Sequence, residues 1–349
     1  MTGVPRGTPI EIKSNFFAVR IALVGFGNVG RALARMILRT GVPFQVTALG
    51  TKSHGAVVDA QGLDLVPLLA GTDLPLRTLP PIRELPADVL VEISTLDPET
   101  GEPALSFIRD ALTAGMHVVT ANKGPIARAF HELDALARSH GRLLRFEATV
   151  ADCLPVFTLR RAALPLADIT AIRGIVSSTN NYILTQCAGG NAFAQALAEA
   201  QRLGIAEADP RHDLEGHDAA VKATILANVL MDADLRPNNV TREVVDERTG
   251  KWAAEVAQHG ARVRPVITVR RTRGGIDASF APERLEAGDP LFAVDGFSMG
   301  LVIDTDLAGR VAVQLHDPHV DQVAYAILTD LLEISAALDT PSGATMPRP

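Results

Sequence analysis

The residues that decide the fold are AVRIALVGFGNVGRALARMILRT, at positions 18–40. The stretch opens with a short apolar run rich in β-formers, Val19–Val24, and it closes with a segment whose apolar side chains recur at helical spacing. Between the two lie Gly25, Gly27 and Gly30, in the spacing GxGxxG. A strand, a glycine turn and a helix in immediate succession are the context that makes this spacing informative.

This stretch is typical of a dinucleotide-binding site. The first glycine makes a tight turn, the second allows the backbone to approach a pyrophosphate, and the third permits close packing of the helix on the strand. Unpaired N–H groups at the start of the helix then bind the phosphates. An ordinary tight turn between strand and helix is the alternative that the pattern disfavours. The predicted cofactor-binding residues of this loop are Gly25, Phe26, Gly27, Asn28, Val29 and Gly30.

The residues that follow the next predicted strand, 44–49, bear on the choice of cofactor. Enzymes that use NAD usually have Asp or Glu at this position, where it binds the ribose hydroxyls. This chain has no acid there and has Lys52 and His54 instead, which would suit the 2′-phosphate of NADP. The alternative is that Lys52 points into water. We therefore expect NADP, or NAD, as the cofactor.

Strands and helices continue to alternate along the first half of the chain. Predicted strands and helices follow one another at residues 88–94, 101–114, 117–120, 126–138 and 143–149. Such alternation predicts an α/β fold of the Rossmann type, a doubly wound parallel sheet that binds ligands at the carboxyl ends of its strands. Three loops at such ends stand out, because they carry Ser94 and Thr95, residues 120–123, and residues 147–150.

Composition excludes several classes of protein. The chain has 349 residues, 47% of them hydrophobic, and a net charge of −7 without any Lys/Arg cluster, so we expect neither nucleic acid nor an anionic membrane as a partner. No apolar run approaches the roughly 18 residues of a spanning helix, and the first residues lack a signal-peptide pattern. Only Cys153 and Cys187 occur, which favours a reducing cytoplasm over a disulfide framework.

A second informative stretch is AEADPRHDLEGHDAAVK, at residues 206–222. A broken acidic loop leads into a predicted helix, on which Asp218 and Lys222 lie four residues apart and hence on one face. A surface ion pair is the ordinary interpretation of such spacing. A lysine on an apolar helix surrounded by acids is more often part of a functional site, which is the interpretation that we favour.

This stretch, with its A-E-A-D-P and D-x-x-G-x-D-A-A-x-K, resembles the homoserine dehydrogenases. DPETGEPALSFIRDAL, TANKGP and EATV resemble the same family, and the resemblance extends over residues 20–334. It implies reversible, NAD(P)-dependent hydride transfer between a nicotinamide and a small hydroxy (amino) acid or semialdehyde. It also implies a second α/β domain for catalysis and dimerisation, hence a homodimer, in a short form that lacks the ACT regulatory domain.

The resemblance also implies roles for individual residues. Lys222 would pass the proton to or from the reacting oxygen and Asp218 would orient it, while Lys123, the lysine of T-A-N-K, would lie at the junction of cofactor and substrate. The residues expected to bind substrate are Glu207, Asp213 and Thr179. The residues expected to bind cofactor beyond the glycine loop are Lys52, Ser94, Thr95 and Lys123.

The chain departs from the family in three loops that are usually glycine-rich. These loops are residues 151–153, Ser177 with Ser178, and residues 316–319. Side chains in place of glycine fill space or make new contacts, so we expect homoserine to be a poor substrate and a related hydroxy acid to be a better one. The family binds a monovalent cation beside the first loop, which makes Glu147 and Val150 candidate ligands.

We divide the chain into two domains with an arm and a tail. The predicted divisions are a flexible arm at 1–17, a dinucleotide-binding domain at 18–153 completed by a helix at 320–335, a catalytic and dimerisation domain at 154–315, and a flexible tail at 336–349. In the second domain, strands are predicted at residues 264–271, 276–280, 291–297 and 300–306.

Two rival functions stay open at this point. Cys153 lies before a predicted helix whose N-terminus would lower the thiol pKa, so the chain could be an acylating semialdehyde dehydrogenase. The histidines that could serve as its base are His212, His217, His316 and His319. The other rival is a nucleotide-sensing homologue without catalysis, which the altered loops permit and the retained Lys123, Asp218 and Lys222 disfavour.

Overall fold

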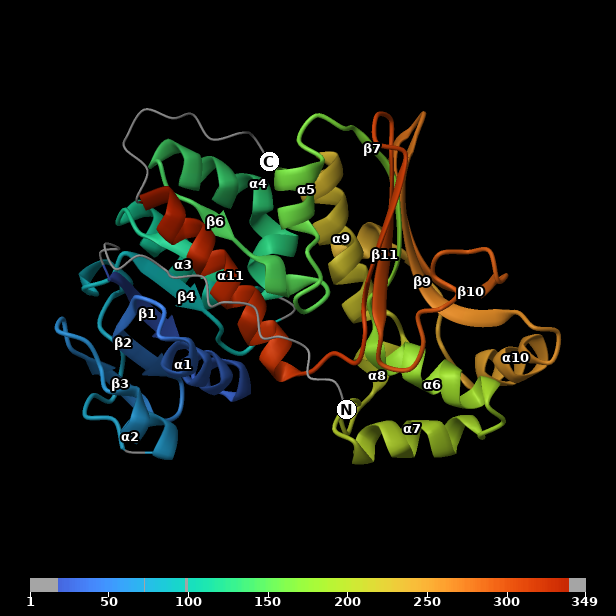
Figure 1. Ribbon diagram of the computed structural model, residues 1–349, viewed down its shortest axis with the longest axis horizontal. Helices are drawn as coiled ribbons and strands as arrows, with labels where there is room; N and C mark the ends of the chain where they lie inside the picture. The colour runs from blue at the N-terminus through green and yellow to red at the C-terminus, as the bar shows by residue number, and fades with distance from the viewer. Residues whose placement is uncertain (1–17, 72, 98–99, 339–349) are drawn as a thin grey trace, which may run out of the picture.

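The computed structural model describes residues 18–71, 73–97 and 100–338. The predicted arm at 1–17 and residues 339–349 of the predicted tail lie outside this part of the chain. Two six-stranded sheets form the frame of the molecule, one in the first half of the chain and one in the second. Figure 1 shows them as two lobes, with the last helix, α11 (Val320–Leu338), returning to the first lobe.

The first sheet has the Rossmann strand order β3-β2-β1-β4-β5-β6. Its strands are β1 (Val19–Val24), β2 (Phe44–Thr51), β3 (Gly55–Val58), β4 (Val89–Glu92), β5 (His117–Thr120) and β6 (Leu144–Arg145). All pairs are parallel except β2 with β3, which form an antiparallel edge. The connecting helices are α1 (Asn28–Thr40), α2 (Leu65–Ala70), α3 (Ala104–Thr113) and α4 (Lys123–Ser139). The predicted doubly wound sheet is thus confirmed.

The last helix, α11, packs on the first sheet beside α1. Ile327, Leu331 and Ile334 of α11 are fully buried in one apolar cluster with Ile21 of β1 and Leu33 of α1. The helix continues three residues beyond its predicted end at 335. A segment from the end of the chain therefore covers a face of the first sheet.

The second sheet has the order β12-β11-β7-β9-β10-β8 and is antiparallel except at its β8 edge. Its strands are β7 (Ile169–Ile175), β8 (Thr241–Arg242), β9 (Arg262–Thr272), β10 (Gly275–Leu285), β11 (Met299–Thr305) and β12 (Arg310–Leu315). The helices of this half are α5 (Phe157–Ala163), α6 (Ser178–Ala188), α7 (Phe193–Arg202), α8 (Arg211–Leu214), α9 (His217–Met231) and α10 (Glu247–Ala257).

One predicted strand is shorter than expected, since of residues 143–149 only Leu144–Arg145 form a strand and Glu147–Thr149 form a 3-10 helix. Another predicted strand, at residues 291–297, is wrong. Residues 291–297 form turns, because Asp295 accepts a hydrogen bond from the N–H of Gly296 and ion-pairs with Arg262 and Arg264. Leu291 and Val294 of this segment are nevertheless buried, in one apolar cluster with Val266 of β9. The apolar run therefore correctly predicted buried residues, but it incorrectly predicted a β-strand.

Within the residues that the structure describes, no helix is both long enough and apolar enough to cross a membrane.

Candidate active site

The glycine loop after β1 has the geometry that its sequence predicts. Gly25 adopts φ +107°, and a Cβ there would lie 2.3 Å from the carbonyl oxygen of Ile93, so only glycine fits. A Cβ at Gly27 would meet nothing, which leaves that backbone open to a ligand, whereas Gly30 packs against Gly25 O and Ile93. Asn28 begins α1, and Gly27 supplies no side-chain cap. The first N–H groups of α1 are therefore available to a phosphate.

The end of β2 carries no acid that could bind a ribose. Lys52 is exposed in the turn that follows, where the hydroxyl of Thr51 accepts a hydrogen bond from the N–H of His54. Asp64, the nearest acid that begins a helix, caps α2 by accepting from Val66 N at 3.0 Å. Lys52 therefore stays a candidate for contact with the cofactor ribose.

A buried glutamate at the end of β4 was missed by sequence reasoning. Glu92 is fully buried, and its carboxylate accepts from Ser94 N and Oγ at 2.9 and 2.5 Å and from Thr120 Oγ1 at 2.9 Å. It thereby ties the loop after β4 to the end of β5, where Lys123 follows. The only trace of Glu92 in the sequence is an acid within the apolar run VLVEI. Such a residue looks like an ordinary strand residue, and its position does not indicate which residues it contacts.

The centre of the candidate active site is a carboxylate between two lysines. Lys123 begins α4 in the first half of the chain, and Lys222 lies on α9 in the second half. One oxygen of Asp218 bonds the ammonium of Lys123, and the other lies 2.8 Å from that of Lys222. The side chain of Asp218 is 10% exposed, so this lysine–aspartate–lysine bridge is screened little by solvent.

The turn before α9 places this bridge. Gly216 adopts φ +71°, and a Cβ there would lie 2.4 Å from the Phe280 ring of β10. The glycine of the D-x-x-G-x-D pattern is therefore required both by its conformation and by the close approach of Phe280. Asp218 follows in the first turn of α9, where a carboxylate is favoured by the helix dipole.

The charges of the bridge keep Asp218 and Lys123 ionised. Burial alone would raise the pKa of Asp218, but Lys123 and Lys222 outweigh burial and hold that pKa far below its ordinary range. Burial would likewise lower the pKa of Lys123, but the carboxylates of Asp218, Asp213 and Asp152 raise it above the ordinary value. The ion pair between Asp218 and Lys123 is therefore present throughout the pH range of a working enzyme.

Lys222 is oriented by two acceptors. Besides Asp218, its ammonium donates to the carbonyl oxygen of Val176, at the end of β7, at 2.5 Å. An ammonium has three donors, so one is left over for a third acceptor. Sequence reasoning did not identify Val176, because a backbone acceptor leaves no signature in residue type.

The predicted substrate residues are arranged unequally around the bridge. Asp213 is half-buried, and burial and the nearby Asp218 raise its pKa. Thr179 is buried in α6 and its hydroxyl donates to Ile205 O at 3.1 Å. Glu207 is exposed in the loop between α7 and α8, where its carbonyl oxygen accepts from a glutamine. The structure thus brings Asp213 to the bridge, whereas Glu207 is exposed to solvent.

Asp152 is a further carboxylate near the bridge. It adopts φ +52° in the turn after Val150, a conformation that favours glycine. Burial raises its pKa, and the charges of Lys222 and Lys123 oppose that rise, as does His319 from the loop before α11. Two of the three loops in which the chain departs from its family, residues 151–153 and 316–319, thus contribute titratable side chains near the bridge.

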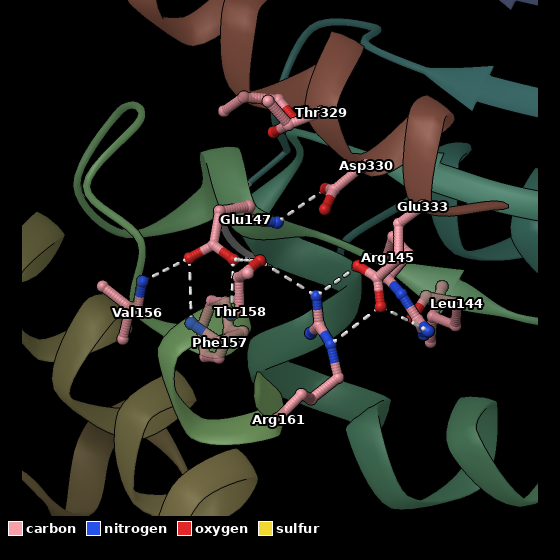
Figure 2. A network of polar contacts seen from close by, with 11 residues as sticks. Leu144, Arg145, Glu147, Val156, Phe157, Thr158, Arg161, Thr329, Asp330 and Glu333 are labelled. Carbon is pink, nitrogen blue, oxygen red and sulfur yellow. Dashed lines mark hydrogen bonds and ion pairs between the residues drawn. The ribbon is translucent and has the colours of Figure 1, made fainter. Parts of the chain in front are cut away.

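Glu147, a candidate cation ligand, has another role in this structure. Figure 2 shows its carboxylate directed at the start of α5, where it accepts from Val156 N, Phe157 N and Thr158 N at 2.5, 2.8 and 2.7 Å, and from the Thr158 hydroxyl at 2.7 Å. Its own N–H donates to Asp330 of α11 at 2.9 Å. These donors occupy the oxygens of the Glu147 carboxylate, so that side chain does not fit a cation, and no cation enters the proposed mechanism.

The same carboxylate argues against Cys153 as a nucleophile. Burial and the negative charges of Asp152 and Glu147 raise the pKa of the Cys153 thiol, which keeps it protonated. The N–H groups of α5 that could have lowered this pKa are already bonded to Glu147. The predicted activation of Cys153 by a helix N-terminus is wrong for this reason.

None of the four candidate histidines is hydrogen-bonded to Cys153 in the part of the chain that is described. His212 and His217 stack on each other with ring centroids 5.7 Å apart, and His217 bonds Glu215. The acylating alternative is therefore not favoured.

The glycine loop and Lys123 lie at the same carboxyl edge of the first sheet, since they follow β1 and β5. A dinucleotide loop on the same edge as a partly buried lysine that is bonded to a carboxylate is the arrangement of a nicotinamide-dependent dehydrogenase.

Comparison with known proteins gives the family. Residues 25–147 match the model of the homoserine dehydrogenase NAD-binding domain, and residues 155–332 match that of homoserine dehydrogenase itself. The chain is 36% identical over 336 residues to an NAD(+)-dependent homoserine dehydrogenase of Pseudomonas canavaninivorans, covering 90% of this chain and 96% of that one. A homoserine dehydrogenase of Methanocaldococcus jannaschii is 33% identical, with 90% and 98% covered. The chain belongs to the homoserine dehydrogenase family.

Solved structures of homoserine dehydrogenases are also similar to this chain. A homoserine dehydrogenase of Thermoplasma acidophilum is similar with a TM-score of 0.80 and 29% identity, covering 91% of this chain and 99% of that one. A hyperthermophilic archaeal homoserine dehydrogenase in complex with NADPH has a TM-score of 0.77 and 28% identity, with 93% of this chain and 98% of that one covered. The predicted fold class, the NAD(P) cofactor and the oxidoreductase class that acts on CH–OH groups are confirmed, and the rival of a non-catalytic nucleotide sensor is not favoured.

Proposed function

We propose that the lysine–aspartate–lysine bridge carries the proton of a reversible hydride transfer on a small amino- or hydroxy acid of the homoserine type. The observation that supports this most is the position of Lys222. Its ammonium donates to Asp218 and to Val176 O, and its third N–H remains for another acceptor. A substrate oxygen at that third position would lie within hydrogen-bond reach of a proton carrier.

When bound, the nicotinamide supplies or accepts the hydride. In oxidation, Lys222 as the neutral amine takes the hydroxyl proton while the hydride leaves the carbon that bears the hydroxyl. In reduction, the ammonium returns the proton to the oxygen as the carbon gains the hydride. Asp218 orients Lys222 in both directions and neutralises the charge of Lys123, which lies where a cofactor on the glycine loop would meet the substrate.

Substrate binding falls to the carboxylates around the bridge. The charges of Lys123 and Lys222 act to lower the pKa of Asp213, so this carboxylate lies near both lysines. It can accept a hydrogen bond from a substrate ammonium or hydroxyl. We assign supporting contacts to Thr179 and Glu207, from α6 and from the loop after α7. Ser94 and Thr95, with Lys52 at the ribose, complete the proposed cofactor contacts, and Lys52 leads us to propose that NADP binds more tightly than NAD.

Asp152 supports a change in substrate selectivity. A carboxylate in a turn that is glycine-rich in the family adds negative charge beside the reacting centre and opposes a substrate carboxylate there. One misplaced group in a pocket changes discrimination by about 1–3 kcal/mol, or 10–200-fold. We therefore propose that homoserine is turned over poorly and that a related hydroxy acid is preferred.

Steady-state kinetics test both statements separately. Small hydroxy and amino-hydroxy acids are assayed with NAD and with NADP, with homoserine as the reference. Turnover of at least one of them supports the reaction, and its absence from the whole panel contradicts it. A kcat/KM for homoserine of about 10⁴ M⁻¹s⁻¹ or more would overturn the selectivity statement alone.

We further propose a homodimer in a reducing cytoplasm. The dimer rests on the family resemblance of the second domain, and the compartment rests on the two cysteines, Cys153 and Cys187, which are both free. Light scattering of the purified chain decides the first, because a monomer would contradict it.

A further inference from the structure

A buried carboxylate lies at the end of β4, between two loops of the candidate active site. Glu92 is 0% exposed, as are residues 89–91, which precede it in the strand. An apolar side chain would fill this end of a parallel strand without the cost of burying a charge. The proton transfer at the lysine bridge does not use Glu92, so its carboxylate calls for another explanation.

The hydrogen-bond partners of Glu92 among the described residues are uncharged donors from two loops. Its Oε1 accepts from Ser94 N at 2.9 Å and from Ser94 Oγ at 2.5 Å, and its Oε2 accepts from Thr120 Oγ1 at 2.9 Å. The shortest of these distances lies in the range of hydrogen bonds from a hydroxyl to a carboxylate anion, about 2.5–2.7 Å. Burial raises the pKa of Glu92, and hydrogen bonds from Ser94, Thr120 and Asn122 oppose that rise. The carboxylate is therefore held by the two loops that it joins.

The Thr120 hydroxyl connects Glu92 to the start of α4. Since its single hydrogen is donated to Glu92, its oxygen accepts from the N–H of Asn122 at 3.0 Å. Asn122 in turn caps α4 by accepting from Gly124 N at 3.2 Å, and Lys123 is the first residue of that helix. Thr120 and Asn122 are 0% and 5% exposed. A short series of buried hydrogen bonds thus runs from Glu92 to the turn that carries Lys123.

The loop after β4 is also packed closely against its neighbours. A Cβ at Gly25 of the glycine loop would lie 2.3 Å from Ile93 O, and a Cβ at Gly124 of α4 would lie 3.2 Å from Asp97 O. Closely packed segments transmit displacements to one another. A shift of the loop after β4 would therefore move both the glycine loop and the start of α4.

The two loops that Glu92 joins face one half of the dinucleotide. A dinucleotide binds across the point at which the strand order reverses, which lies between β1 and β4 in this sheet. Its adenosine ribose lies at the end of β2, so its nicotinamide half extends over the ends of β4 and β5. The loops that follow these two strands carry Ser94 and Lys123.

We propose that Glu92 is a positioning residue for the nicotinamide half of the cofactor. Through Ser94 and Thr120, its carboxylate fixes the loop after β4 against the start of α4, and so fixes the surface on which the nicotinamide ring rests. The assignment rests on the proposed contacts of Ser94 and Lys123. A misplacement of about 1 Å from a change outside the reacting groups can lower a rate by about 10²-fold.

Glu92→Gln tests the proposal, because it keeps the size of the side chain and leaves one acceptor oxygen where the carboxylate has two. Ser94 and Thr120 can then no longer both donate to it as they do in the parent. Thr120→Val, which removes the hydroxyl and keeps the volume, is the second variant and decides the matter where Glu92→Gln does not fold. In both, kcat at saturating cofactor and substrate should fall by about 10–100-fold.

Two binding measurements separate positioning from a general loss of structure. The reduced dinucleotide that binds more tightly, NADPH or NADH, is bound at saturation, and the decay of its nicotinamide fluorescence anisotropy reports motion of the ring. ADP-ribose, with a 2′-phosphate where NADP is preferred, reports binding of the remainder of the cofactor. We expect a ring that is immobile in the parent and mobile in both variants, with the Kd for ADP-ribose unchanged.

Asp88→Asn is the matched control. Asp88 directly precedes the same strand at its other end, and its carboxylate also accepts three hydrogen bonds, all from Arg20. This variant should lose stability without added motion of the ring. A ring that is mobile in the parent, that stays immobile in Glu92→Gln and Thr120→Val, or that gains as much motion in Asp88→Asn would overturn the proposal, as would a matching loss of ADP-ribose affinity in Glu92→Gln. Absence of turnover by the parent would contradict the proposed function alone, since neither binding measurement needs a substrate.

Discussion

Replacing Asp218 with Asn removes the charge between two ammonium groups and keeps the shape of the side chain. Lys222 Nζ lies 2.8 Å from Asp218 Oδ2, with side chains that are 13% and 10% exposed. At that distance and an effective dielectric constant of about 20, the attraction is about 6 kcal/mol before desolvation is subtracted. Breaking a buried pair by removing one partner costs about 3–5 kcal/mol net, and Lys123 loses its partner too. We expect a loss of stability in that range.

Asp134→Asn is a matched control. Asp134 and Arg138 on α4 are also four residues apart and also 2.8 Å apart, but Arg138 is 57% exposed. Such a surface pair contributes only about 0.3–0.5 kcal/mol. The two variants share the substitution, the helical spacing and the distance, so burial and the second lysine are what distinguish them.

Urea unfolding of both variants measures the difference, and fluorescence titration with the reduced cofactor verifies that the first domain is intact. Turnover should fall by about 10²–10⁴ in Asp218→Asn, the usual contribution of a general acid or base, because Lys222 loses the group that orients it. If the two variants lose equal stability, or if Asp218→Asn turns over like the parent, the bridge does not have the role assigned to it.

Four other results are expected. Lys222→Ala should lower turnover by about 10²–10⁴ while dinucleotide binding persists, and parental turnover would remove Lys222 from the mechanism. Lys52→Asp should erode or reverse the preference for NADP in competition assays, and an unchanged preference would place Lys52 outside the ribose site. Burial raises the pKa of Asp330 to about 7, well above its unfolded value, so the native state keeps this proton and the free energy of unfolding decreases as pH rises from about 4 to 7; Asp330→Asn should flatten that decrease in urea titrations, and an identical slope would contradict the assignment. Cys153→Ser should retain hydride transfer, whereas loss of turnover with intact cofactor binding would revive the thiol mechanism.

The first half of the fold could be predicted because its signals are local. The run Val19–Val24 and the glycines after it report strand, turn and helix within a few residues, and parallel strands follow from the alternation. The second half gave weaker signals. Helix α10 was missed although Asp246 caps it through Thr249, and β12 was missed because its side chains alternate only between partial burial and exposure. Antiparallel pairing of distant strands leaves little trace in any one of them.

The site divides in the same way. Asp218 and Lys222 could be paired from their spacing on one helix, whereas Lys123 is 95 residues away from Asp218 and only the family resemblance brought it to them. The contacts that sequence reasoning missed are Val176 O, Glu92 and the capping of α5 by Glu147. Each depends on a backbone atom or on burial at a strand end, and neither is encoded in residue type or in spacing. The sequence marked Asp152 only as a residue in a loop that is usually glycine-rich in the family. That it lies near both lysines is visible only in the structure.

The position of α11 has a consequence for how the chain is made. Glu147 N–H and Asp330 join across 183 residues, and the apolar face of β1 and α1 is covered by α11. At about 5–20 residues per second, a ribosome needs roughly 10–40 s to make that interval. For that time the nascent first domain has every strand of its sheet but lacks α11, so the apolar face of β1 and α1 stays uncovered. The first domain can therefore complete its packing only after the last helix has been made, which departs from the usual N-terminal-first order of domain folding.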